Sequence, residues 1–206
     1  MLQEQKAIVG RDVGKLQELL DAGAGERDWS WRGKERKTAL ELAAVIGQPE
    51  MVKLLAEAGA NPNHLSASGY SALHQASMWG QFDCVKELVR AGADHRLRTK
   101  SGETSRQLAL RYRNTACSDY LSGVEARRVL NEAVQEARGM LTDSELIAGR
   151  WNKEDKAKVT ALCQDKEQWL AHSEECFEEI VHQTNDFRVL IQPYFDKLQL
   201  ISRKTV

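Results

Sequence analysis

Proline is scarce in this chain, with three in 206 residues. Because proline breaks helices and is enriched in disordered segments, its scarcity favours a helical chain. No apolar run approaches the about 20 residues that span a membrane, and the first residues lack the apolar stretch of a secretory signal peptide. We therefore expect no membrane association and a cytoplasmic, reducing location.

Cysteine pairs are also missing. None of the four cysteines forms a CxxC pair or a short Cys/His cluster, and all fall on segments with helical periodicity: Cys84, Cys117, Cys163 and Cys176. Free cysteines on helices are usually small buried apolar residues. The sequence therefore predicts no metal site and no cofactor.

An excess of charge of one sign is lacking too. Residues 1–122 hold 17 Lys and Arg against 15 Asp and Glu, and the remaining residues hold 12 against 15. Neither part has the positive field typical of nucleic-acid binding, so no nucleic-acid partner is expected. We interpret the local basic run as a solvated loop rather than a site for nucleic acid or acidic lipid: Arg32, Lys34, Arg36 and Lys37.

Enzyme signatures are absent from the sequence. We find no phosphate-binding glycine loop, no HExxH, no GxSxG, and no histidine spaced for catalysis from an acid or a cysteine. The acidic pairs Glu174-Glu175 and Glu178-Glu179 fit a solvated helix face better than a catalytic dyad. We expect a non-catalytic protein with no small-molecule substrate.

What the sequence does contain is an internal repeat. Equivalent residues recur 33 positions apart without a gap: Thr38, Ser71 and Thr104, Leu40 and Leu73, Gly47 and Gly80, Gly59 and Gly92, and Gly69 and Gly102. Each unit has two short apolar patterns with helical spacing, separated by a glycine. One such unit cannot bury its apolar face alone, so the units must stack.

These units resemble the ankyrin repeat. Thr38-Ala39-Leu40 and Ser71-Ala72-Leu73-His74 stand where that family has its T-P-L-H word, and Gly59-Ala60-Asn61 and Gly92-Ala93-Asp94 match its G-A-D/N word. The resemblance implies an ankyrin solenoid over 1–122, with about three to four repeats. The end repeats are degenerate: the first shows only half a unit, and the last has Arg106 and Arg113 in place of leucine and glycine.

The same resemblance implies a binding surface, because ankyrin ligands usually meet the turn tips and the exposed face of the first helices. Transferred position by position, the candidate groove residues are Lys37, Val45, Ile46, Tyr70, Met78, Trp79, Glu103, Arg111 and Tyr112. Their apolar members would form one stripe, and Trp, Tyr and Arg are common anchors at interfaces. Either a protein partner or the chain's own C-terminal helices could cover this stripe. The resemblance also implies that His74 holds the turn by hydrogen bonding.

Trp29 and Trp31 lie in a longer loop, 25–33. Two tryptophans two residues apart would point to one side of an extended segment. They would either staple the loop onto the first repeat or form an adhesive tip.

From Gly123 the helical periodicity continues without the repeat. We expect a connecting helix over about 124–138 and linker over the rest of 123–148, then an antiparallel three-helix bundle over 149–206. In that bundle Asn152 is a candidate N-cap with Asp155 three residues later, and Pro193 is predicted in the first turn of a last short helix.

The tail has a resemblance of its own. Over about 149–198 it is similar to the C-terminal helical lid of the seventy-kilodalton heat-shock chaperones, on the basis of Lys153–Val159, Cys163, Trp169-Leu170, Phe177, His182 and Pro193. The chain has neither the ATPase nor the β substrate domain of those chaperones. The resemblance therefore implies a docking or spacing module rather than a chaperone cycle.

An ankyrin block followed by such a tail resembles one group of ankyrin-repeat proteins, with contributions from Gly69-Tyr70, Trp79-Gly80, Arg111-Tyr112 and Glu154-Asp155-Lys156. This implies a non-catalytic adaptor or assembly subunit in a cytoskeletal or ciliary assembly. The alternatives are a co-chaperone-like modulator that acts through the lid-like tail, and a structural subunit with both faces buried in a large assembly.

Overall fold

The computed structural model describes residues 3–22, 38–142, 151–172 and 177–199. Within these ranges all regular secondary structure is helical, as the repeat and the periodicity predict. The chain divides into two compact units, Met1–Leu121 and Ser122–Val206. The basic run at 32–37, both loop tryptophans and Cys176 lie outside the described residues.

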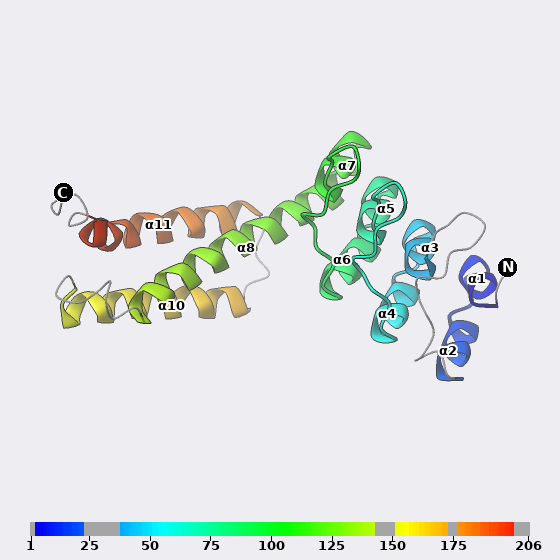
Figure 1. Cartoon of the computed structure of the whole chain (residues 1–206), viewed down its shortest axis with the longest axis horizontal. Coiled ribbons are helices and arrows are strands. Elements are labelled where there is room, and N and C mark those ends of the chain that lie inside the picture. The colour runs from blue at the N-terminus through cyan, green and yellow to red at the C-terminus, as the bar shows by residue number, and fades with distance from the viewer. Residues whose placement is uncertain (1–2, 23–37, 143–150, 173–176, 200–206) are drawn as a thin grey trace. The chain divides into compact units, whose positions relative to one another are not determined.

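The first unit is a stack of helix pairs. Its helices are α1 (Gln3–Val9), α2 (Val13–Asp21), α3 (Ala39–Ile46), α4 (Pro49–Glu57), α5 (Ala72–Trp79), α6 (Phe82–Arg90) and α7 (Ser105–Arg111). Figure 1 shows two rows: α1, α3, α5 and α7 pack side by side, and α2, α4 and α6 form the second row. The half-unit predicted at the N-terminus is a full helix pair, because α1 and α2 pack against α3 and α4 respectively.

Each first helix starts at a residue of the repeat word. The side chains of Thr38, Ser71 and Thr104 accept the backbone N–H three residues later, and the side chain at that later position accepts the cap's own N–H. This reciprocal capping box satisfies two backbone donors that an α-helix leaves without a partner. The 33-residue spacing therefore fixes the starts of α3, α5 and α7.

Small side chains let neighbouring repeats approach closely. Alanines on the first helices are fully buried, and leucines from both rows fill the space between them. The cluster includes Ala43, Ala76, Leu40, Leu73 and Leu88. A larger residue at either alanine would hold the helices apart.

Two glycines and two amides join successive repeats. Gly47 (φ 79°) and Gly80 (φ 69°) end α3 and α5 in the left-handed conformation, and a Cβ on either would overlap Gln81 or Asn114 of the next repeat. The Asn114 side-chain amide donates to the carbonyls of Ser77 and Met78, both at 2.9 Å. Each amide thus caps the end of the preceding repeat's first helix.

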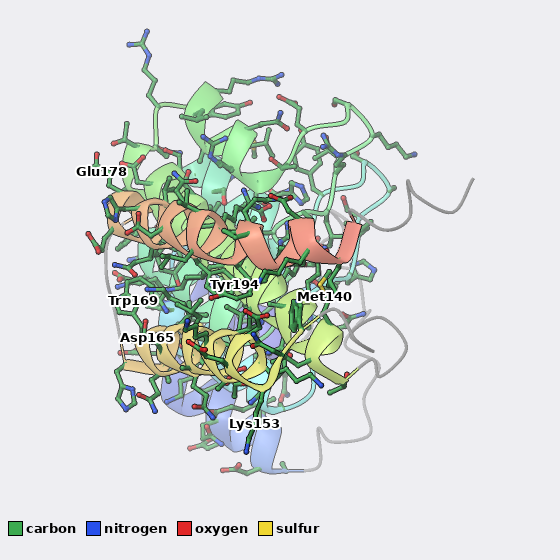
Figure 2. The ribbon with its side chains drawn as sticks, turned by 90° about the vertical axis from the view of Figure 1, so that its left-hand side faces the viewer. Met140, Lys153, Asp165, Trp169, Glu178 and Tyr194 are labelled. Carbon is green, nitrogen blue, oxygen red and sulfur yellow. The ribbon has the colours of Figure 1, made fainter. Side chains whose placement is uncertain are left out.

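The second unit is an antiparallel helical bundle. α8 (Thr115–Thr142) begins in the first unit and continues into the second, followed by α10 (Lys153–His172) and α11 (Phe177–Gln199). Figure 2 looks onto this bundle, in which Met140, Trp169 and Tyr194 come from different helices and pack on one core. That core contains Leu130, Val134, Ala137, Trp151, Val159, Cys163, Phe187, Ile191 and Leu198.

Polar contacts set the direction of the bundle helices. The Trp151 indole N–H donates to the Tyr194 carbonyl at 3.1 Å, and Lys197 Nζ lies 2.8 Å from Asp155 Oδ1. Further along, Lys166 Nζ donates to Gln183 Oε1 at 2.6 Å. Because the start of α10 meets the end of α11, these helices are antiparallel.

The helix boundaries in this half differ from the predictions. α8 extends well beyond 124–138 and includes Gly139, and Pro193 lies inside α11 rather than at the start of a separate helix. The third helix of the bundle is therefore α8, because its residues Leu130 and Val134 enter the same core as α10 and α11. Buried Ile191 and Leu198 lie on either side of Pro193 and hold α11 against one core.

The predicted cap of α10 is confirmed. The Asp155 N–H donates to Asn152 Oδ1 at 2.7 Å, and the Asn152 N–H donates to Asp155 Oδ2 at 3.3 Å. The Lys197 ammonium holds the pKa of the Asp155 carboxyl below its ordinary value.

Candidate interaction surface

The groove residues predicted from the repeat occupy three sets of equivalent positions. The first set directly precedes the capping residues: Lys37, Tyr70 and Glu103. The second set lies near the ends of the first helices: Val45, Met78 and Arg111. The third set is the next residue along the chain in each unit: Ile46, Trp79 and Tyr112. Lys37 lies outside the described residues. The other eight belong to three successive units of one stack.

Trp79 and Tyr112 are the exposed aromatic residues of this surface. Trp79 is the last residue of α5 and Tyr112 directly follows α7, and their exposed fractions are 59% and 51%. A large apolar side chain that keeps more than half of its surface in water gains free energy when a partner covers it. This pair is therefore the part of the surface best suited to anchor a ligand.

The equivalent pair in the preceding unit is less exposed. Val45 and Ile46 are half-buried, and Ile46 packs against the core of the stack. Met78 is half-buried as well. The expected stripe is thus apolar throughout but projects into solvent mainly at its aromatic end.

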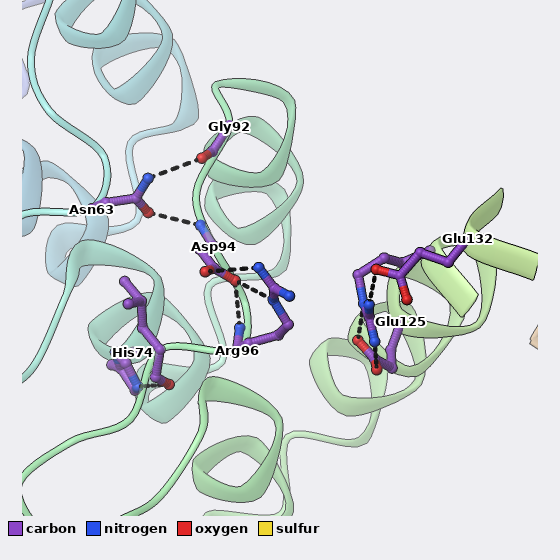
Figure 3. A network of polar contacts seen from close by, with 9 residues as sticks. Asn63, His74, Gly92, Asp94, Arg96, Glu125 and Glu132 are labelled. Carbon is purple, nitrogen blue, oxygen red and sulfur yellow. Dashed lines mark hydrogen bonds and ion pairs between the residues drawn. The ribbon is translucent and has the colours of Figure 1, made fainter. Parts of the chain in front are cut away.

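Tyr70 lies beside a buried histidine that organises the turn. Its ring meets the ring of His74 edge to face, with centroids 6.1 Å apart. The Ser71 N–H donates to His74 Nδ1 at 3.1 Å, which leaves Nε2 to donate to the Leu97 carbonyl at 3.0 Å. Figure 3 shows this last contact, which links two repeats. The predicted turn-holding role of His74 is confirmed.

Burial lowers the pKa of His74, although hydrogen bonds to the backbone near Leu97 and Glu103 oppose that shift. A neutral ring fits the geometry, because Nδ1 must accept a hydrogen bond. His74 is therefore a structural residue behind the surface rather than a proton carrier on it.

The preceding unit makes the equivalent contact, with its histidine on the opposite side of the pair. Glu41 occupies the position equivalent to His74, and His64 occupies the position equivalent to Leu97. His64 Nδ1 lies 3.1 Å from Glu41 Oε1, and Glu41 is almost completely buried. The substitution of glutamate for the family's histidine is thus matched by a partner side chain.

Arg111 and Glu103 form an ion pair on the surface. The Arg111 side chain remains 58% exposed, whereas that of Glu103 is 16% exposed. The arginine is therefore the more exposed member of the pair.

Polar contacts also join the loops that follow α4 and α6. Asn63 Nδ2 donates to the Gly92 carbonyl at 3.2 Å, and the Asp94 N–H donates to Asn63 Oδ1 at 2.7 Å. Asp94 in turn pairs with Arg96 at 3.1 Å (Figure 3). These bonds connect successive repeats through side-chain and backbone groups of their loops.

Other kinds of site find no support in the described part of the chain. No group of three His, Cys, Asp or Glu residues there could hold a metal ion. Burial raises the pKa of the Cys84 thiol to about 12, and burial also raises the pKa of Cys117 and Cys163. None of the helices searched is long and apolar enough to cross a membrane.

Two features of the surface were missed from the sequence. One is the Glu41–His64 pair, whose members are 23 residues apart and meet only across the fold. The other is the cluster of exposed cations in the last repeat, which the nearly balanced charge of residues 1–122 conceals.

A model of ankyrin repeats in three copies matches residues 7–99 and 40–134. The chain belongs to the ankyrin-repeat family. Proteins built from such repeats generally bind other proteins and are generally non-catalytic.

Three relatives carry the name ankyrin repeat domain-containing protein 45. The human protein is 36% identical over 82% of this chain, the mouse protein 34% over 79%, and the Danio rerio protein 33% over 52%. The chain spans 66% of the human and mouse proteins and 47% of the Danio rerio protein. The crystal structure of the ankyrin repeat domain of Bcl-3 is similar with a TM-score of 0.56 and 25% identity, covering 59% of this chain and 56% of that one.

Proposed function

We propose that this chain is a non-catalytic adaptor that binds a protein partner through the ankyrin groove. The observation that carries the proposal is the exposure of Trp79 and Tyr112 at equivalent positions in successive repeats. Tryptophan and tyrosine are enriched among the residues that dominate binding energy at interfaces. The proposed groove also includes the other predicted residues of the described region: Val45, Ile46, Tyr70, Met78, Glu103 and Arg111.

The helical bundle is the proposed second contact of the adaptor. Val189 and Leu190 on α11 are 72% and 50% exposed. The cellular setting that we propose, a cytoskeletal or ciliary assembly, rests on the whole-chain sequence resemblance alone. The alternative is a co-chaperone-like modulator that acts through the lid-like tail.

Proximity labelling in cells tests these proposals, with the wild-type chain compared with a Trp79→Ala/Tyr112→Ala variant. We expect cytoskeletal or ciliary neighbours with the wild type and their loss with the variant. The melting temperature of the purified variant should stay close to that of the wild type, because both side chains are more than half exposed.

Two results would overturn the adaptor proposal. If the neighbours are chaperones and persist in the variant, the tail is the working part of the protein. If the purified variant unfolds, the two aromatic side chains belong to the core of the protein and do not form a binding surface.

A further inference from the structure

The last two repeats differ sharply in charge. Residues 62–81, which contain Tyr70 and Trp79, include no Lys, Arg, Asp or Glu. The equivalent residues 33 positions later, 95–114, include one acid, Glu103, and six cations: Arg96, Arg98, Lys100, Arg106, Arg111 and Arg113. All six are exposed. The groove therefore changes from uncharged to strongly basic within one repeat.

Neighbouring acids neutralise only part of this charge. Glu103 pairs with Arg111, and Asp94, just outside the segment, pairs with Arg96. Counting both acids, 94–114 has six positive and two negative side chains, a net charge of +4. A local excess of this size attracts acidic ligands, although the whole chain is nearly neutral.

The cations lie next to the aromatic anchors. Arg111 and Arg113 flank Tyr112 in the chain, and Arg113 takes the left-handed conformation (φ 61°) at the position equivalent to Gly47 and Gly80. At the tip of the repeat, the Lys100 N–H donates to the Ser68 carbonyl at 3.3 Å, so Lys100 lies beside the uncharged segment 62–81. Aromatic and cationic groups thus form one surface across both repeats.

We propose that this basic and aromatic surface, defined by Trp79, Lys100, Arg111, Tyr112 and Arg113, binds an acidic protein segment that carries an apolar side chain. The apolar side chain packs on Trp79 of the one repeat and Tyr112 of the next, and the carboxylates face the cations of the last repeat. This inference rests on the proposed function of the groove, and it specifies the chemistry of the partner.

A protein segment fits this surface better than a nucleic acid. A polyanion of regular charge spacing needs cations along its whole path, whereas the repeat that carries Trp79 has none between residues 62 and 81.

The test is selection of a displayed library of random peptides on the full chain. We expect the enriched peptides to be acidic and to share an aromatic or aliphatic residue. Their binding, measured by fluorescence anisotropy, should weaken as salt rises, because exposed charges are screened over about 10 Å at 0.1 M ionic strength. A Lys100→Glu/Arg113→Glu variant should bind them at least about ten-fold more weakly.

The matched control is Lys53→Glu/Arg90→Glu, which makes the same change in net charge on α4 and α6, in the second row of helices. Both control residues are exposed, and their pairs with Glu57 and Glu87 are surface contacts of small energy. This control should bind as the wild type does.

Each outcome decides between the two proposals. Neutral or basic peptides that still require Trp79 and Tyr112 would overturn the acidic-partner inference and leave the groove function standing. Acidic peptides that bind the Lys100/Arg113 variant and the wild type equally would overturn it as well. If a single-stranded oligonucleotide binds more tightly than the selected peptides, the acidic-segment inference is overturned in favour of a nucleic-acid partner. If no peptide is enriched on the wild type or on either variant, the result counts against the groove function itself.

Discussion

The two units of the chain are both helical but obtain their architecture in different ways. In the repeat unit, the first helices α3, α5 and α7 have seven or eight residues and begin at capping residues that recur every 33 positions. In the bundle, helices of 20, 23 and 28 residues are held by one apolar core and a few polar contacts. Local hydrogen bonds specify the first unit, whereas long-range packing specifies the second.

Because of this difference, the two units respond differently when a helix is removed. A repeat depends on its neighbours, while the bundle depends on every helix that lines its core. α8 provides three fully or almost fully buried residues of that core, Leu130, Val134 and Ala137. The bundle is therefore incomplete without a helix that precedes residue 149.

The largest expected effect follows from this dependence. A fragment of residues 122–206 should show strong helical circular dichroism and a cooperative melt. A fragment of residues 149–206 should lose most of its helicity, because α10 and α11 would expose the face that α8 covers. Equal ellipticity per residue and equal melting temperatures for the two fragments would contradict the role assigned to α8.

A smaller effect is expected from one core truncation in the repeats. Leu73 is completely buried on α5, so Leu73→Ala should reduce the free energy of unfolding by about 2–5 kcal/mol. Leu110→Ala serves as the control, since Leu110 is half-exposed on α7 and should cost much less. Denaturant titration measures both changes, and similar losses for the two variants would mean that the repeat register is wrong.

The repeat made most of the first unit predictable from the sequence. Because Thr38, Ser71 and Thr104 are fixed by spacing, the starts of α3, α5 and α7 follow without knowledge of the packing. The helices after Gly123 could not be placed as well. An apolar stripe shows that a helix is amphipathic, but it does not show where the helix ends or which helix it meets. Gly139 and Pro193 are ordinary breaking signals, and here both lie inside helices.

The candidate surface was predictable in position but not in exposure. Spacing placed Ile46 and Trp79 at equivalent sites, yet Ile46 packs on the core whereas Trp79 projects into solvent. Spacing alone does not report which side chains the rest of the fold covers. The partner of Glu41 was hidden for a similar reason, because His64 is 23 residues away and contacts it only across the fold.

The smallest expected effect is a pH dependence of stability in the repeat unit, which contains His74. Burial gives His74 a lower pKa in the folded chain than its ordinary value of about 6.5. The folded state then binds fewer protons than the unfolded state at this site. The stability that depends on neutral His74 is fully present above the unfolded pKa, and it is lost as the pH falls below that value toward the folded pKa.

A His74→Gln variant isolates this contribution from the other histidines. Glutamine already occupies the equivalent position in the last repeat, where Gln107 Oε1 accepts the Thr104 N–H at 2.9 Å. The substitution therefore keeps an acceptor for the cap while removing the titrating group. Thermal melts of both chains between pH 7 and pH 5 should show a shallower decline for the variant. Parallel declines would mean that protonation of His74 does not limit the stability of the repeats, and that its hydrogen bonds to Ser71 and Leu97 can rearrange around a charged ring.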